Sequence, residues 1–168
     1  MKSKILVSMI STFALLVMST MAYSESGLSY DDTVTLIQKT MIGSDSGIRK
    51  ESYGYIRFDK CLMEYNVLGT YPVGELYNLK FSQIDFSSLN PAGSKTGNDY
   101  TDFVILDFDT PLRRTDNGKD LMIRTVVFNA SPEEKTQVLF QAFLHLGELC
   151  GAAKNPLPLV RSALPLSN

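Results

Sequence analysis

The segment SPEEKTQVLFQAFLHLGELCG (residues 131–151) carries the clearest structural pattern in this chain. Ser131 stands at the N-cap of a predicted helix, Pro132 at its first position and Glu134 at its third, which together make a capping box. Apolar residues then recur at helical spacing. The expected inward face consists of Leu139, Phe143, Leu146 and Cys150, flanked by Val138, Ala142 and Leu149. Gly151 is placed to end the helix.

Residues 51–128 alternate between apolar and polar side chains with a period of two, which indicates half-buried strands. Strands are expected at 53–58, 61–68, 77–81, 103–108 and 121–128. Asn117-Gly118 is the residue pair of a type I′ hairpin turn, so the last two strands are expected to be antiparallel neighbours. The stretch from Ser87 to Tyr100 is rich in Ser, Asn, Gly and Pro and is expected to be a long loop.

A second helix is predicted near the start of the domain, with Ser29 as its N-cap and Gly43 at its end. Its apolar stripe is Tyr30, Val34, Ile37 and Met41. The pattern as a whole predicts one α+β domain over residues 25–153. In that domain an N-terminal helix, an antiparallel sheet or open barrel of about five to seven strands, and a C-terminal capping helix pack together.

Residues 1–24 have the features of a secretory signal peptide: a basic start at Met1–Lys4, an apolar core over 5–18, and small residues after it. Cleavage is expected after Ala22 or after Ser24. The alternative is an uncleaved membrane anchor, but the apolar core is shorter than the roughly 18 residues that a span needs. We therefore expect a periplasmic or secreted protein without a stable membrane anchor. Residues 154–168 are expected to form an extended, proline-rich tail.

The 168 residues include two cysteines, Cys61 and Cys150, and a single histidine. An oxidising compartment favours a disulfide between the two cysteines, with two separate buried thiols as the alternative. The formal net charge of −2 gives no electrostatic reason to expect a nucleic acid as partner.

The segment from Ala142 to Gly151 resembles the C-terminal helix, of the form A-L-x-H-L-x-x-L-C-G, of small uncharacterised exported bacterial proteins. Those proteins also have a cysteine after an early strand, as at Cys61, and a segment similar to 79–85. The resemblance implies a pleckstrin-homology-like arrangement and implies no reaction. Gly147 departs from the family pattern, which predicts either a weaker helix or a close backbone contact.

Candidate chemical groups are few. His145 has no nucleophile motif elsewhere in the chain to serve and is expected to be structural. Asp107 and Asp109 fall on one side of a strand and are a candidate acid/base pair or the solvent face of that strand. Residues 116–120 resemble a calcium loop only faintly, because the loop lacks ligands that calcium needs. Arg113-Arg114 is read as a solvated basic pair. No catalytic residue, metal or cofactor is expected.

Tyrosines are numerous in one half of the chain, and they suit protein interfaces because they bury a large area at low entropic cost. The candidate interface residues are Tyr53, Tyr55, Tyr65, Tyr71 and Tyr77. We therefore expect a non-enzymatic, exported binding module for another protein, such as an immunity or inhibitor protein. The alternatives are a small periplasmic hydrolase that uses Asp107 and Asp109, or a carrier of a small apolar ligand.

Overall fold

The computed structural model describes residues 27–42, 51–70, 74, 76–99 and 101–153. These residues form an α+β structure with an N-terminal helix, one antiparallel sheet of six strands and a C-terminal helix, as predicted. In chain order the elements are α1 (Tyr30–Ile42), β1 (Ser52–Asp59), β2 (Leu62–Thr70), β3 (Leu76–Asp85), the 3-10 helix η2 (Phe86–Ser88), β4 (Leu89–Asp99), β5 (Thr101–Asp116), β6 (Lys119–Asn129) and α2 (Glu133–Leu149). The predicted signal peptide, the tail and Gly43 lie outside the described residues.

The long strand β5 organises the sheet. Along one edge, its first half pairs with β4 and its last residues, Arg113–Asp116, pair with β3. Along the other edge it pairs with β6, across a register shift between Asp107 and Leu112. The strands are joined in the order β1-β2-β3-β5-β4, with β6 also on β5. The Asn117-Gly118 hairpin is confirmed, because both residues have positive φ and Asp116 pairs with Lys119.

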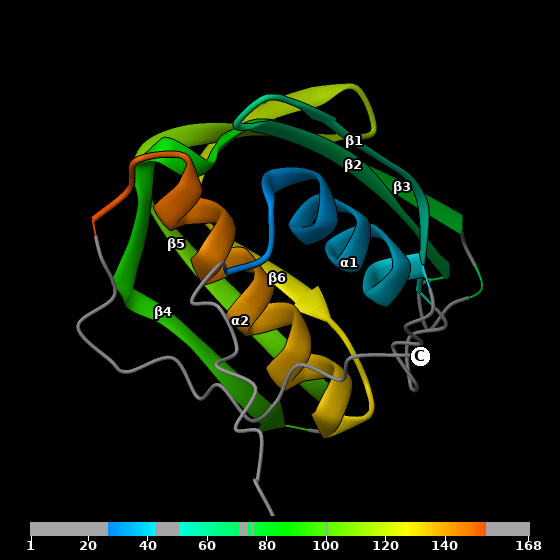
Figure 1. The fold of residues 1–168 in the computed structure, drawn as a ribbon. Helices are drawn as coiled ribbons and strands as arrows, with labels where there is room; N and C mark the ends of the chain where they lie inside the picture. Colours follow the sequence, from blue (N-terminus) through cyan, green and yellow to red (C-terminus); the bar gives the residue numbers. More distant parts are fainter. Residues whose placement is uncertain (1–26, 43–50, 71–73, 75, 100, 154–168) are drawn as a thin grey trace, which may run out of the picture.

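Both helices lie against the same side of the curved sheet, where they contact each other (Figure 1). The core between helices and sheet is aromatic at its centre. Phe143 of α2 has its ring 4.7 Å from that of Phe128 and stacks at 5.6 Å on that of Phe86. Ile37 and Met41 of α1 are fully buried, as their helical spacing predicts. Ser29 caps α1 by accepting a hydrogen bond from the Asp32 N–H at 3.2 Å.

The expected loop at 87–100 is wrong, because most of it forms η2 and β4. The pairing of β4 with β5 is interrupted between Asn90 and Lys95, where Ser94 Oγ accepts the Asp107 N–H at 3.0 Å. A Cβ on Gly97 would lie 2.4 Å from the Phe103 ring, so the glycine allows the ring to lie over the strand. The Ser, Asn, Gly and Pro residues that predicted a loop are therefore part of an irregular strand.

The beginning of α2 also differs from the prediction. The Ser131 hydroxyl accepts the Asp102 N–H at 3.2 Å instead of capping the helix, which starts at Glu133 after Pro132. The capping box is therefore wrong, because a contact with β5 uses the serine. Leu149, expected to flank the inward face, is 45% exposed. Gly151 has a φ of 88° and follows the end of the helix as expected.

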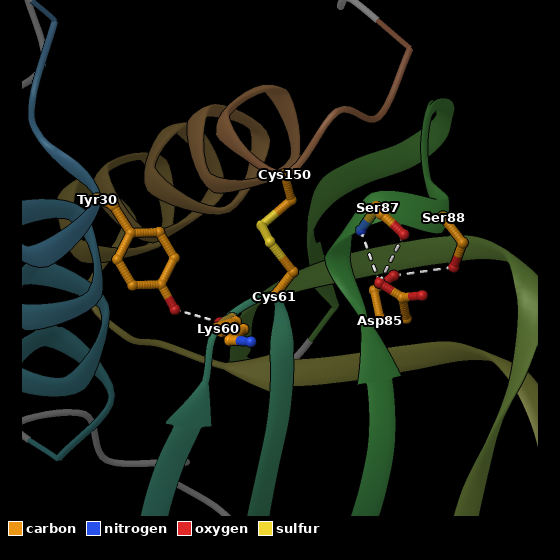
Figure 2. Close-up of a disulfide and its surroundings, with 7 residues drawn as sticks. All are labelled: Tyr30, Lys60, Cys61, Asp85, Ser87, Ser88 and Cys150. Atoms are coloured by element: carbon orange, nitrogen blue, oxygen red, sulfur yellow. Dashed lines mark hydrogen bonds between the residues drawn. A yellow bond between two sulfur atoms is a disulfide. The ribbon is translucent and has the colours of Figure 1, made fainter.

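Cys61 and Cys150 form the predicted disulfide, with Cα atoms 5.7 Å apart (Figure 2). The bond joins the end of α2 to the turn between β1 and β2. In the same region the Tyr30 hydroxyl of α1 donates to the Lys60 carbonyl, and the Phe86 N–H donates to the Cys61 carbonyl at 2.9 Å. Both helices and the first three strands are thus held together around one turn.

Candidate functional site

Of the two carboxylates singled out from the sequence, one is held by neighbouring side chains. Asp107 accepts hydrogen bonds from Asn90 Nδ2 at 3.1 Å and from Thr125 Oγ1 at 3.2 Å, so it ties β4 and β6 to β5. Asp109 is exposed in the stretch where the pairing of β5 with β6 shifts register. The acid/base assignment stays a prediction.

The hairpin at residues 116–120 uses its carboxylates within the sheet. Asp116 pairs with Arg114 at 3.1 Å, and Asp120 accepts a hydrogen bond from Thr115 Oγ1 at 2.7 Å. In the part of the chain that the structure describes, no three His, Cys, Asp or Glu side chains lie together as metal ligands would.

His145 connects the segment before α1 to α2. Its Nε2 lies 2.8 Å from the Leu28 carbonyl oxygen, a distance at which the ring nitrogen donates a hydrogen bond. A Cβ on Gly27 would lie 3.1 Å from the same ring, so the chain crosses closely over it. This contact gives His145 a structural role.

The tyrosines do not form one exposed surface. Tyr65 is fully buried and Tyr77 is 8% exposed, so the prediction of an interface is wrong for these two rings. Tyr55 is half-buried beneath the Arg57 guanidinium, at 5.2 Å. Tyr53 is half-buried and donates its hydroxyl to the Asn129 carbonyl at 3.1 Å. Tyr71 lies outside the described residues.

The contact between Tyr53 and Asn129 belongs to a group of hydrogen bonds around the start of β1 and the end of β6, which we call the latch. Glu51, just before β1, accepts hydrogen bonds from the Tyr77 hydroxyl and from Asn129 Nδ2. Burial, and then the charge of Glu51, raise the pKa of the Tyr53 hydroxyl, which stays protonated as a donor. The latch, defined as Glu51, Tyr53, Tyr77 and Asn129, brings the beginning of β1 to the end of β6.

A groove of about 940 Å³ extends from this latch. It is lined by Glu51, Val67, Leu79, Phe81, Asp99, Thr101, Phe103, Arg114, Ile123, Thr125, Val126, Val127 and Asn129. Its wall is largely apolar, and its charged members among the described residues are Arg114, Glu51 and Asp99. Such a combination of apolar walls and a few polar groups is typical of binding sites.

The groove follows the free edge of β6. Successive side chains of a strand point to opposite faces, whereas its backbone N–H and C=O groups point sideways. Thr125, Val126 and Val127 are consecutive and all line the groove. Among the described strands β6 pairs with β5 alone, so its other edge presents backbone groups to the groove.

Three buried polar atoms without a partner belong to a residue that lines this groove or to residues whose strand partners line it. Four side-chain atoms in the described residues are buried without a hydrogen-bond partner, and three of them are Tyr65 Oη, Arg114 Nε and Asp116 Oδ1. Burial raises the pKa of the Tyr65 hydroxyl well above its ordinary value, and the nearby Arg114 charge partly opposes that rise.

Arg114 was not among the predicted site residues, because Arg113-Arg114 was interpreted as a solvated basic pair. The residue lies in β5, and its side chain is 33% exposed. The sequence did contain one signal for this position. If the strand continues beyond residue 108, Leu112, Arg114 and Asp116 are two residues apart and point to the same face of the sheet. The groove itself had no local signal, since its walls come from strands distant in sequence.

Comparison with known proteins finds no matching family model, no curated relative and no similar solved structure. Among the described helices, none combines the length and the apolar character needed to cross a bilayer.

Proposed function

We propose that this protein is an exported, non-enzymatic binding module that takes an extended segment of another protein along the free edge of β6. The observation that carries the proposal is the run of consecutive β6 residues in the groove wall, from Thr125 to Val127. A strand edge next to an apolar groove supports strand addition, in which main-chain hydrogen bonds give affinity and side-chain pockets give specificity.

Exposed apolar side chains on the same strand support this proposal. Leu121, Met122 and Val127 are 51%, 59% and 50% exposed, although β6 belongs to the edge of a sheet. An edge strand with exposed apolar residues and unpaired backbone groups is a template for pairing with another chain. An added segment would cover these side chains while it satisfies the free backbone groups.

The disulfide and the predicted signal peptide support a location outside the cytoplasm, in the periplasm or beyond the cell. An inhibitor or immunity protein would suit such a location, because it needs a stable binding surface and no catalytic group. The pleckstrin-homology-like arrangement implied by the resemblance stays part of this proposal.

Site-specific photo-crosslinking in the native host tests the proposal. A photoreactive amino acid at Val127 should give one discrete protein adduct, because this side chain lines the groove. Leu149 is the matched control, since it is similarly exposed, at 45%, and lies at the end of α2. An adduct at Leu149 but none at Val127 would place the interaction elsewhere and refute the groove as the binding site.

The size of the groove also supports a second candidate, a carrier of a small apolar ligand. A volume of about 940 Å³ with walls such as Phe81, Leu79 and Ile123 could bury most of such a molecule. Native mass spectrometry of protein exported by its own host distinguishes the two candidates. A bound small mass that is lost on denaturation would favour the carrier.

A further inference from the structure

Tyr65, Arg114 and Asp116 each have one buried polar atom without a hydrogen-bond partner, and these residues lie at or behind the groove wall. We propose that they form a subsite for a neutral side chain that both donates and accepts hydrogen bonds, namely the carboxamide of Gln or Asn. The inference rests on the proposed function, because the carboxamide would be carried by the extended segment that pairs with β6.

Strand register places the three groups together. Tyr65 of β2 pairs with Phe81 of β3, and Phe81 pairs with Arg114 of β5, so the three residues form one row across the sheet. Asp116 stands two residues beyond Arg114 and pairs with Leu79. The Tyr65 ring stacks on Phe81 at 4.8 Å. Phe81, Leu79 and Arg114 all line the groove, so the subsite lies directly behind its wall.

The charges of the subsite select a neutral group. Arg114 Nη2 and Asp116 Oδ2 are 3.1 Å apart and form an ion pair, so the pair carries no net charge. An added carboxylate would meet the Asp116 carboxylate and, at the groove wall, that of Glu51. An added ammonium group would be attracted by Asp116, but it would bring a net charge into a buried site and lose its hydration there. A carboxamide carries no net charge, and its NH₂ and C=O groups complement Asp116 and Arg114.

The hydrogen-bonding inventory of the unpartnered atoms matches a carboxamide. Arg114 Nε–H is a donor, Asp116 Oδ1 is an acceptor, and the Tyr65 hydroxyl can be either. The oxygen of a Gln or Asn side chain would accept from Arg114 or Tyr65, and its NH₂ group would donate to Asp116. Arg114 connects the groove to the subsite, because it lines the groove and also carries one of the three unpartnered atoms.

The unpartnered atoms do not stabilise the fold as they stand. A buried polar group without a hydrogen bond is unfavourable compared with the same group in water. A bound group that forms hydrogen bonds with these atoms would remove this unfavourable free energy. The protein would therefore bind such a group more tightly than an apolar side chain. This is the physical basis on which a polar site rejects an analogue that lacks the matching group.

Peptide binding to the full exported and oxidised protein tests the subsite. The probes are nine-residue peptides of alternating valine and threonine in which the central residue is Gln, Asn, Leu, Glu or Lys. Titrations are followed by NMR through the backbone amides of β6 and the Nε–H of Arg114. Gln or Asn peptides should bind about fivefold to tenfold more tightly than the Leu peptide, as one or two net hydrogen bonds imply.

Tyr65→Phe is the decisive variant, since it removes only an unpartnered hydroxyl. We expect it to reduce the preference for Gln over Leu, whereas Tyr55→Phe, on the neighbouring strand, should leave that preference intact. If the Gln and Leu peptides bind equally and both shift the β6 amide signals, the subsite proposal is wrong, but the proposal that β6 binds an extended segment is supported. If no peptide shifts the β6 amides, the proposed function fails, and the subsite fails with it.

Discussion

Gly147 of α2 lies directly against Leu89, the first residue of β4. A Cβ on Gly147 would come within 2.7 Å of Leu89 Cδ2 and 3.4 Å of Leu89 Cβ, and Leu89 is 2% exposed. The absence of a side chain at Gly147 therefore allows the Leu89 side chain to pack closely against the helix. The helix accepts a residue of low helical propensity at this position because β4 packs against it.

We expect Gly147→Ala to destabilise the protein by up to about 2 kcal/mol. Alanine favours a helix over glycine by about 1 kcal/mol, but overpacking a buried contact costs about 1–3 kcal/mol and more where the neighbour cannot move. Denaturant unfolding measures the balance. The double variant Gly147→Ala/Leu89→Ala provides the control, because removing the leucine side chain should make the alanine at 147 favourable.

The disulfide should stabilise the fold substantially, because it closes a segment of 89 residues. The chain-entropy model predicts about 4–5 kcal/mol for a loop of this length, and measured losses are about 2–5 kcal/mol. Cys150→Ser should lower the melting temperature, and a reducing agent should lower that of the natural protein but not that of the variant. Identical melting with and without reductant would contradict the prediction.

Two tyrosine hydroxyls in the same core should respond oppositely to removal. Tyr53→Phe removes a hydrogen bond to the Asn129 carbonyl and should cost about 1 kcal/mol. Tyr65→Phe removes a buried hydroxyl that has no partner among the described residues, so the stability should be unchanged or higher. A large loss in Tyr65→Phe would mean that its hydroxyl makes a hydrogen bond in solution.

The same tyrosines predict instability at alkaline pH. Burial raises the pKa of both hydroxyls above the ordinary value of 10.0. The folded state thus binds these protons more tightly than the unfolded state does. Their contribution to stability is complete below pH 10 and decreases as the pH rises above it. Unfolding measured from pH 8 upward should show this decrease, and Tyr53→Phe should make it shallower.

The elements with strong local signals were predicted well. Periodicity of two located most of the sheet, and the Asn117-Gly118 pair located a hairpin, because these signals depend only on neighbouring residues. The beginning of α2 was wrong because Ser131 bonds to Asp102, which is distant in sequence. β4 was not predicted, because two features that explain its Gly and Ser residues involve another strand. These features are the interrupted pairing with β5 and the Phe103 ring that lies against Gly97.

The candidate site was less accessible to prediction than the fold. Cys61 and Cys150 could be paired because the chain has only two cysteines. The groove requires the curvature that brings Glu51 near Asn129, and no spacing in the sequence encodes this contact. The tyrosine count indicated an interface, but packing placed Tyr65 and Tyr77 inside the core instead.

The disulfide also affects how the chain responds to proteases. The segment between Cys61 and Cys150 contains every strand from β2 onward and all of α2. A cut at the exposed Asn117-Gly118 turn would leave one cysteine on each fragment, so the two pieces would remain covalently tethered. The fragments would also keep the hydrogen bonds between β5 and β6. A nicked molecule would thus retain its fold and the edge of β6.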